Sequence, residues 1–295
     1  MSTTAAAVPL APAGASPQRK VALFLVLAVA LCVPFYYLII SASALRAEGK
    51  LYVLGLTWAP AVAALITRLV FQRNVRGMGW AWRDTRLALA AYALPLAAAL
   101  PVYGLAWITG FGGVSTDGLG PHAAANLGVS FSSPAANIAL LLVAGVLFAG
   151  VFALGEELGW RGLLVPELAK FTSFGRVAFI SGVIWTLYHV PVIIGADYRS
   201  AAPVAYGVVC FTAMVLSFSV LIAWLRLKSG SVWPAVIVHA SHNILVQAIF
   251  DTLTVDRGRT QYITTEFGAG LAIAYGVIAW LCWRRRHELP SGESA

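Results

Sequence analysis

The chain has 295 residues, of which 60% are hydrophobic and 11% are charged. Soluble domains average about 45–50% apolar and about 25% charged residues, so this composition excludes an ordinary soluble domain and indicates a polytopic membrane protein. The net charge is +8. Because the cations flank apolar runs, membrane topology explains them better than nucleic-acid binding does. Cys32, Cys210 and Cys282 lie singly in apolar runs without metal-binding spacing, so we expect no disulfide.

Apolar runs of the length that crosses a bilayer predict an all-α fold of about eight transmembrane helices. The expected spans are 21–45, 51–71, 87–108, 135–166, 177–194, 203–225, 232–250 and 264–283. We expect a single membrane domain over 19–286, between a disordered cytoplasmic tail, 1–18, and a second cytoplasmic tail, 287–295. Residues 109–134 contain no Lys or Arg and are predicted to form an outer loop.

The distribution of positive charge predicts the orientation of these helices. With eight spans both termini lie on one side, and that side collects fifteen Lys and Arg against five on the other. Cytoplasmic loops carry an excess of these residues. The sequence therefore predicts an integral membrane protein with cytoplasmic N- and C-termini. The Ala-rich composition suggests a bacterial source, and hence the inner (plasma) membrane.

Two adjacent glutamates, Glu156 and Glu157, interrupt an apolar run that has no ionisable residue from Ala135 to Leu154. Carboxylates at such a depth are costly and are retained mainly for function. On a helix Glu157 and Arg161 are four residues apart, so they can form an ion pair on one face. This pairing leaves Glu156 available as a general base toward water. The competing interpretation is an interfacial Glu/Arg cluster that merely ends a helix.

Two imidazoles occur within later apolar runs, each paired at a spacing of four with another polar or aromatic residue. Trp185 and His189 share one helical face, as do His239 and Asn243. At about 1.5 Å per residue, Glu156 lies about 15 Å from Pro166, and the two imidazoles are at comparable depths in their helices. We therefore expect these side chains to converge around one water-sized site, although intramembrane histidines also form plain interhelical hydrogen bonds.

This set of groups suits the hydrolysis of an amide bond by activated water. Glu156 and His189 can polarise and deprotonate the water, while His239 and Asn243 can donate hydrogen bonds to the tetrahedral oxyanion. Neither a serine nor a cysteine is placed convincingly as a nucleophile. Glu156, His189 and His239 equally make a possible first shell for zinc, and the sequence does not choose between zinc and metal-free activation.

The same residues resemble the signatures EExxxR, FxxxH and HxxxN of the CPBP family of intramembrane proteases, the CAAX prenyl endopeptidases and their Abi relatives. Here the signatures read Glu156-Glu157-xxx-Arg161, Trp185-xxx-His189 and His239-xxx-Asn243, in that order. The segment GEELGWRGLLVPEL is similar to the first motif of the bacterial branch of this family. The resemblance spans the proposed protease core, 135–250.

This resemblance implies an eight-helix fold with a conical cavity open to the cytosol. It implies that the first Glu and first His, here Glu156 and His189, activate water, and that His239 and Asn243 form the oxyanion hole. Glu157 and Arg161 match the supporting part of the first motif. Trp185 replaces the usual Phe, and we expect this exchange to alter pocket shape more than chemistry. His242 lies outside the pattern and is predicted to make a polar contact between helices.

The resemblance also suggests substrates and a rival function. Eukaryotic relatives remove the last three residues of prenylated proteins, so the partner here is expected to be a membrane-anchored peptide or protein, with membrane lipid around it. Some bacterial relatives are linked to bacteriocin immunity, so a non-catalytic immunity or scaffold protein is the alternative. A transporter with a proton relay would predict inverted-repeat symmetry, and none is visible in the sequence.

Overall fold

The computed structural model describes residues 15–42, 50–196 and 198–290. These residues form an all-α membrane protein, apart from one short two-stranded ribbon. The predicted tail 1–18 lies outside the described residues except at its end, where α1 already begins at Pro17. The second predicted tail is described only to Pro290, and within it Arg286–Glu288 form a 3₁₀ turn.

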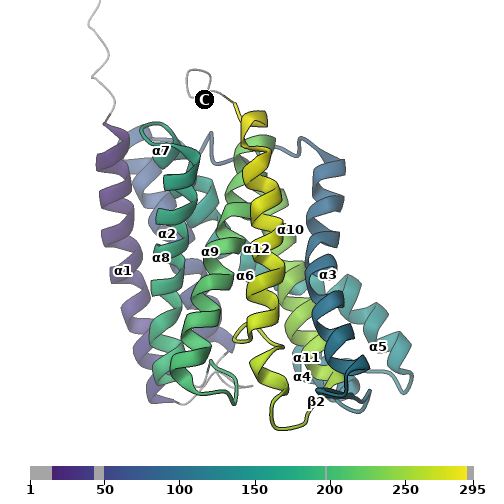
Figure 1. The fold of residues 1–295 in the computed structure, drawn as a ribbon. Helices are drawn as coiled ribbons and strands as arrows, with labels where there is room; N and C mark the ends of the chain where they lie inside the picture. The colour runs from purple at the N-terminus through teal and green to yellow at the C-terminus, as the bar shows by residue number, and fades with distance from the viewer. Residues whose placement is uncertain (1–14, 43–49, 197, 291–295) are drawn as a thin grey trace, which may run out of the picture.

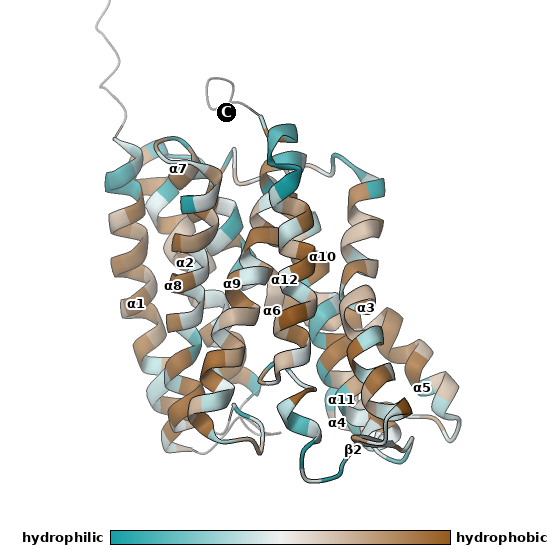
Figure 2. Cartoon of the chain, viewed as in Figure 1, coloured by the Kyte–Doolittle hydropathy of each residue, from teal (hydrophilic) through white to brown (hydrophobic). Residues whose placement is uncertain are grey.

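Seven helical runs in the described part of the chain are long and apolar enough to cross a membrane. Five of these runs are single helices: α1 (Pro17–Ser41), α2 (Lys50–Gln72), α3 (Thr85–Ile108), α8 (Phe174–Gly195) and α9 (Val204–Ser229). The other two runs, Pro134–Ala169 and Trp233–Leu253, are composite. Hydrophobic residues cover the middle of these helices and hydrophilic residues gather at their ends (Figure 2), as expected for segments surrounded by lipid.

Both composite runs contain π-helical turns, in which each backbone N–H bonds to the carbonyl five residues earlier in the chain. The first run consists of α5 (Pro134–Leu140), η2 (Leu141–Gly145), α6 (Val146–Gly159), η3 (Trp160–Leu164) and α7 (Val165–Ala169). It therefore passes Pro166, where we expected its end. The second run consists of α10 (Trp233–His242), η4 (Asn243–Phe250) and α11 (Asp251–Leu253). Such π-turns occur frequently at functional sites.

The predicted eighth span is shorter than expected. Its helix, α12 (Ala269–Arg284), has 16 residues, which corresponds to about 24 Å. The expected start at Thr264 is wrong because residues 264–268 form a turn. Thr265 there has φ of 64°, a left-handed conformation that an α-helix does not accept, and Gly270 donates its backbone N–H to Ile263 at 2.9 Å.

The predicted outer loop, 109–134, contains regular structure. Its helix α4 (Leu119–Leu127) packs on the first composite run, and its strand β1 (Gly112–Val114) pairs antiparallel with β2 (Thr254–Asp256). Figure 1 shows α4 and β2 at one end of the molecule. The first residues of α1 and the last of α12 lie at the other end, so the two ends of the described chain share one face.

Candidate functional site

The Glu-Glu pair is fixed in place by a close approach between α6 and α2. Gly155 and Gly159 flank the pair, and a Cβ on them would lie 2.6 Å from the Thr57 carbonyl oxygen and 2.5 Å from the Pro60 Cβ. Small residues four apart allow helix backbones to approach in this way inside membranes. Larger side chains at either position would push α6, and with it Glu156, away from α2.

Glu157 faces the protein interior and holds two partners. One of its oxygens, Oε1, lies 3.0 Å from the Arg161 guanidinium and 3.0 Å from Nδ1 of His239. The predicted pairing of Glu157 with Arg161 is confirmed, and both side chains are fully buried. The contact to His239 was not expected from the sequence. It joins the first and third motifs directly and requires Nδ1 to carry the proton, since a carboxylate accepts.

Glu156 accepts a hydrogen bond from the indole N–H of Trp185, at 2.8 Å from its Oε2. The Trp185 ring also lies beneath the Arg161 guanidinium, 4.3 Å from its centroid, and meets the His239 ring edge to face. We expected the exchange of Phe for Trp to change shape more than chemistry. The structure adds a hydrogen bond that Phe cannot make. The Trp185 N–H orients the Glu156 carboxylate and leaves Oε1 of that carboxylate for another partner.

His189 is oriented by its own helix. Its Nδ1 lies 2.8 Å from the backbone carbonyl of Trp185, and a carbonyl can only accept, so Nδ1 carries the proton. The Nε2 atom then presents a lone pair. In this tautomer His189 can accept a proton from a water molecule, as a general base must.

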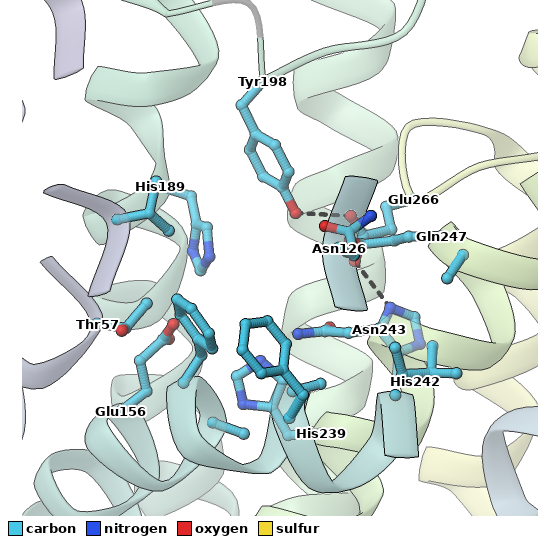
Figure 3. A pocket seen from close by; sticks show the side chains of 18 of the residues that line it. Thr57, Asn126, Glu156, His189, Tyr198, His239, His242, Asn243, Gln247 and Glu266 are labelled. Atoms are coloured by element: carbon cyan, nitrogen blue, oxygen red, sulfur yellow. Dashed lines mark hydrogen bonds and ion pairs between the residues drawn. The ribbon is translucent and has the colours of Figure 1, made fainter. Parts of the chain in front are cut away.

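All four predicted catalytic residues line one cavity of about 660 Å³. In Figure 3, His189 and Glu156 lie on the left of it and His239 lies at the bottom, and Asn243 reaches in from the next turn after His239. Asn243 is the first residue of the π-helical segment η4. The structure therefore brings the four residues that the sequence grouped together around one common space. This space is larger than the single-water site that we expected.

A second polar group on the same cavity was missed by the sequence interpretation. His242 bonds through Nδ1 to the Tyr275 hydroxyl at 2.7 Å and through Nε2 to Glu266 at 2.8 Å. Glu266 accepts a further bond from the Tyr198 hydroxyl at 2.6 Å (Figure 3). The predicted interhelical contact of His242 is confirmed by its bond to α12. Glu266 had one usable signal, since it is an acidic residue within an expected span.

The geometry does not fit the zinc interpretation. Among the described residues, no group of three His, Cys, Asp or Glu side chains is arranged to hold a metal ion. Nδ1 of His189, Nδ1 of His239 and Oε2 of Glu156 bond to the protein, which leaves Nε2 of each histidine and Oε1 of Glu156. We derive no step through a metal.

The mouth of the cavity lies at the α4 end. Its lining includes Lys50, His122 and Asn126, whereas the loops 73–84, 170–173, 230–232 and 285–290 at the other end contribute no lining residue. Burial, together with the nearby Lys50 ammonium, lowers the pKa of His122 in α4. The cavity thus opens opposite the first residues of α1. Which of the two ends faces the cytoplasm stays a prediction.

Comparisons with known proteins agree with the motifs. Residues 135–245 match the model of the Rce1-like family, described as type II CAAX prenyl endopeptidase Rce1-like. The chain is also similar to CAAX prenyl protease 2 of Methanococcus maripaludis, with 29% identity over 139 residues, 44% of this chain and 48% of that protein. The chain thus spans about half the length of the curated relative that it matches.

The matched region contains Glu156, Glu157, Arg161, Trp185, His189, His239 and Asn243. It also covers the two π-helical turns of the first composite run and the start of the third. Membership of the bacterial branch stays a prediction. The family match over 135–245 and the curated relative together support the resemblance of this integral membrane protein to the CPBP family, the group of Rce1-like CAAX prenyl endopeptidases.

Proposed function

We propose that this protein is an intramembrane endopeptidase that hydrolyses a peptide bond with water activated by Glu156 and His189. One observation carries the proposal: a carboxylate, two imidazoles and an amide line a single cavity within the helical bundle. The family match and the CAAX protease relative support a protease. Ser181 and Ser241 bond to backbone carbonyls of their own helices, so water is the better nucleophile.

The proposed reaction begins with a water molecule between Glu156 and Nε2 of His189. Glu156 Oε1 takes a proton as the water oxygen attacks the scissile carbonyl carbon. Negative charge then develops on the carbonyl oxygen, where Asn243 Nδ2–H and Nε2–H of a protonated His239 donate hydrogen bonds. The Glu157 carboxylate stabilises that cation through Nδ1–H. As the C–N bond breaks, the proton on Glu156 passes to the leaving amine.

We propose that the substrate enters from the non-cytoplasmic face. The excess of Lys and Arg predicts that the α1 and α12 ends lie in the cytoplasm, and the cavity mouth lies at the opposite end. In this arrangement the peptide bond is hydrolysed after substrate enters through the non-cytoplasmic mouth. Two exposed positions test it, Asn74 at the termini end and Ser132 at the mouth end.

In a variant with its native cysteines replaced, Ser132→Cys should react with a membrane-impermeant maleimide in intact cells, and Asn74→Cys only after lysis. The reverse pattern would place the termini outside and the mouth in the cytoplasm. The labelling therefore decides the orientation without any knowledge of the substrate.

The proposed substrate is a membrane-anchored peptide or protein, with C-terminal CAAX-type processing as the first example to test. The experiment is cleavage of a quenched farnesylated CAAX peptide by purified protein, with and without a strong chelator. We expect cleavage that resists the chelator, and a loss of about 10³-fold or more in Glu156→Ala, as for other essential catalytic groups. Glu288→Gln, at an exposed glutamate outside the cavity, is the control and should keep full activity.

Equal cleavage by Glu156→Ala and the wild type would overturn the role of Glu156. Loss of activity with the chelator would restore the zinc interpretation. If wild type cleaves neither this peptide nor a broad library of membrane-anchored peptides, the immunity or scaffold alternative becomes the better explanation.

A further inference from the structure

Tyr198 connects the proposed base to a residue outside the family motifs. Its ring stacks on His189, with centroids 5.9 Å apart and planes inclined by 29°. Its hydroxyl donates to Glu266 at 2.6 Å. The ring of His189 is anchored at Nδ1 and also meets Trp185, Tyr188 and Phe211 edge to face. The stacked Tyr198 ring completes the contacts that restrict rotation about that anchor. The orientation of Nε2 therefore depends on where Glu266 holds Tyr198.

His242 connects the same glutamate to the proposed oxyanion donor. Both ring nitrogens of His242 are occupied, by Tyr275 and by Glu266, and Phe218 packs on the ring with centroids 5.1 Å apart. The next residue is Asn243, where the backbone changes from α-helical to π-helical turns. Holding His242 from two sides fixes the rotation of that turn, and so fixes the direction in which Asn243 points.

Glu266 itself is held firmly enough to act as an anchor. It is only 6% exposed and lies in the turn before α12, next to Thr265 with φ of 64°. Its Oε1 accepts a bond from His242 and its Oε2 accepts one from Tyr198, and the Gln247 side chain donates a further bond to the carboxylate. Glu266, Tyr198 and Gln247 also line a second cavity of about 320 Å³. They therefore form the wall between this space and the proposed catalytic cavity.

We propose that Glu266 is a positioning residue that sets the geometry of both halves of the site. Through Tyr198 it orients His189, which acts on the water, and through His242 it orients the turn that carries Asn243, which binds the oxyanion. The inference rests on the proposed function. It predicts that loss of the Glu266 charge affects the rate of the chemical step more than the binding of substrate.

The test compares kcat and KM of Glu266→Gln and Tyr198→Phe with those of the wild type. Glu266→Gln keeps the size of the side chain but one of its two acceptor oxygens becomes an N–H donor, whereas Tyr198→Phe keeps the stacked ring and loses the hydroxyl. We expect kcat to fall about 10- to 100-fold in Glu266→Gln, as for a lost bond to a charged group, with KM within about twofold.

The losses in the double variant should be less than additive, because Tyr198 acts through Glu266. Tyr206→Phe is the matched control. Its hydroxyl bonds to the Tyr262 carbonyl, away from the lining of the catalytic cavity, and its loss should leave kcat unchanged. Additive losses, or a wild-type kcat in Glu266→Gln, would overturn the proposal.

Amide hydrogen exchange gives a readout that does not depend on activity. In Glu266→Gln, exchange should accelerate in peptides that cover 185–192 and 239–250, and it should not change there in Tyr206→Phe. If the wild type cleaves no peptide, the proposed function fails, and this exchange pattern still decides the positioning role. Unchanged exchange in both peptides would contradict the positioning role of Glu266.

Discussion

Two acid–imidazole pairs lie three residues apart on α10 and differ in what they leave free. His239 bonds to Glu157 through Nδ1 only, so its Nε2 faces the cavity. His242 bonds through both nitrogens, to Tyr275 and Glu266, and has no ring nitrogen left for a substrate. The same two residue types therefore serve chemistry at one position and geometry at the other.

The acids of the two pairs differ as well. Glu157 shares its charge with a fully buried arginine, Arg161, whereas Glu266 has the neutral donor Tyr198 as its second partner. The first pair is thus part of a cluster with Arg161 that would stabilise the protonated His239 of the proposed mechanism. The second pair connects two helices, α10 and α12, with the turn of Glu266 and the loop of Tyr198. Variants at each pair should separate these roles.

The largest effect is expected for Glu157→Gln. It leaves Arg161 buried without a counter-charge, and the Nε and Nη2 atoms of that arginine already lack a hydrogen-bond partner among the described residues. Removal of one member of a buried pair costs about 3–5 kcal/mol. Thermal unfolding in detergent should show the loss. The double variant Glu157→Gln/Arg161→Met should regain most of the stability and remain nearly inactive, because His239 still lacks its acid.

A matched pair of substitutions tests the contrast between the two histidines. His239→Leu should lower kcat about 10²- to 10³-fold, the usual loss for one oxyanion donor, with a small change in thermal midpoint. His242→Leu should lower the thermal midpoint more, and kcat less, than His239→Leu does, because Glu266 loses a buried partner and Asn243 loses only its positioning contact. Kinetics and unfolding of both variants check this. If both variants lose activity and stability equally, the division of roles is wrong.

A smaller effect is expected for Trp185→Phe, which restores the residue usual in the family motif. It removes the indole N–H bond to Glu156 and keeps an aromatic ring beneath Arg161. We expect kcat to fall about 3- to 10-fold. The effect is small because the Glu156 carboxylate lines the cavity and can bond to water there, whereas an acceptor that stayed desolvated would cost more. Unchanged kcat would show that this bond does not orient the carboxylate.

The sequence predicted the catalytic half of the site because its residues lie on long helices with regular spacing. Glu157 with Arg161 and His239 with Asn243 are pairs that a helical period of about 3.6 brings to one face, and apolar runs locate their helices in the membrane. The family motifs add their order. Contacts within one helix and the common depth of the helices therefore follow from local pattern alone.

The bracing half could not be predicted in the same way. Tyr198 lies between α8 and α9, and Glu266 lies in a turn that we had assigned to a helix. Their meeting depends on how two loops fold back on the bundle, which periodicity does not encode. Likewise, the bond from Glu157 to His239 joins residues 82 positions apart. Only tertiary packing brings them together.

The placement of the cavity mouth has a practical consequence for handling the protein. Because the mouth and the two ends of the described chain lie on opposite faces, a fluorescent fusion or an affinity tag at either end would not obstruct substrate entry. Protein captured by such a tag on a surface would present its mouth to the flowing solution. A nanobody raised against α4, in contrast, would cover the entrance and should act as an inhibitor.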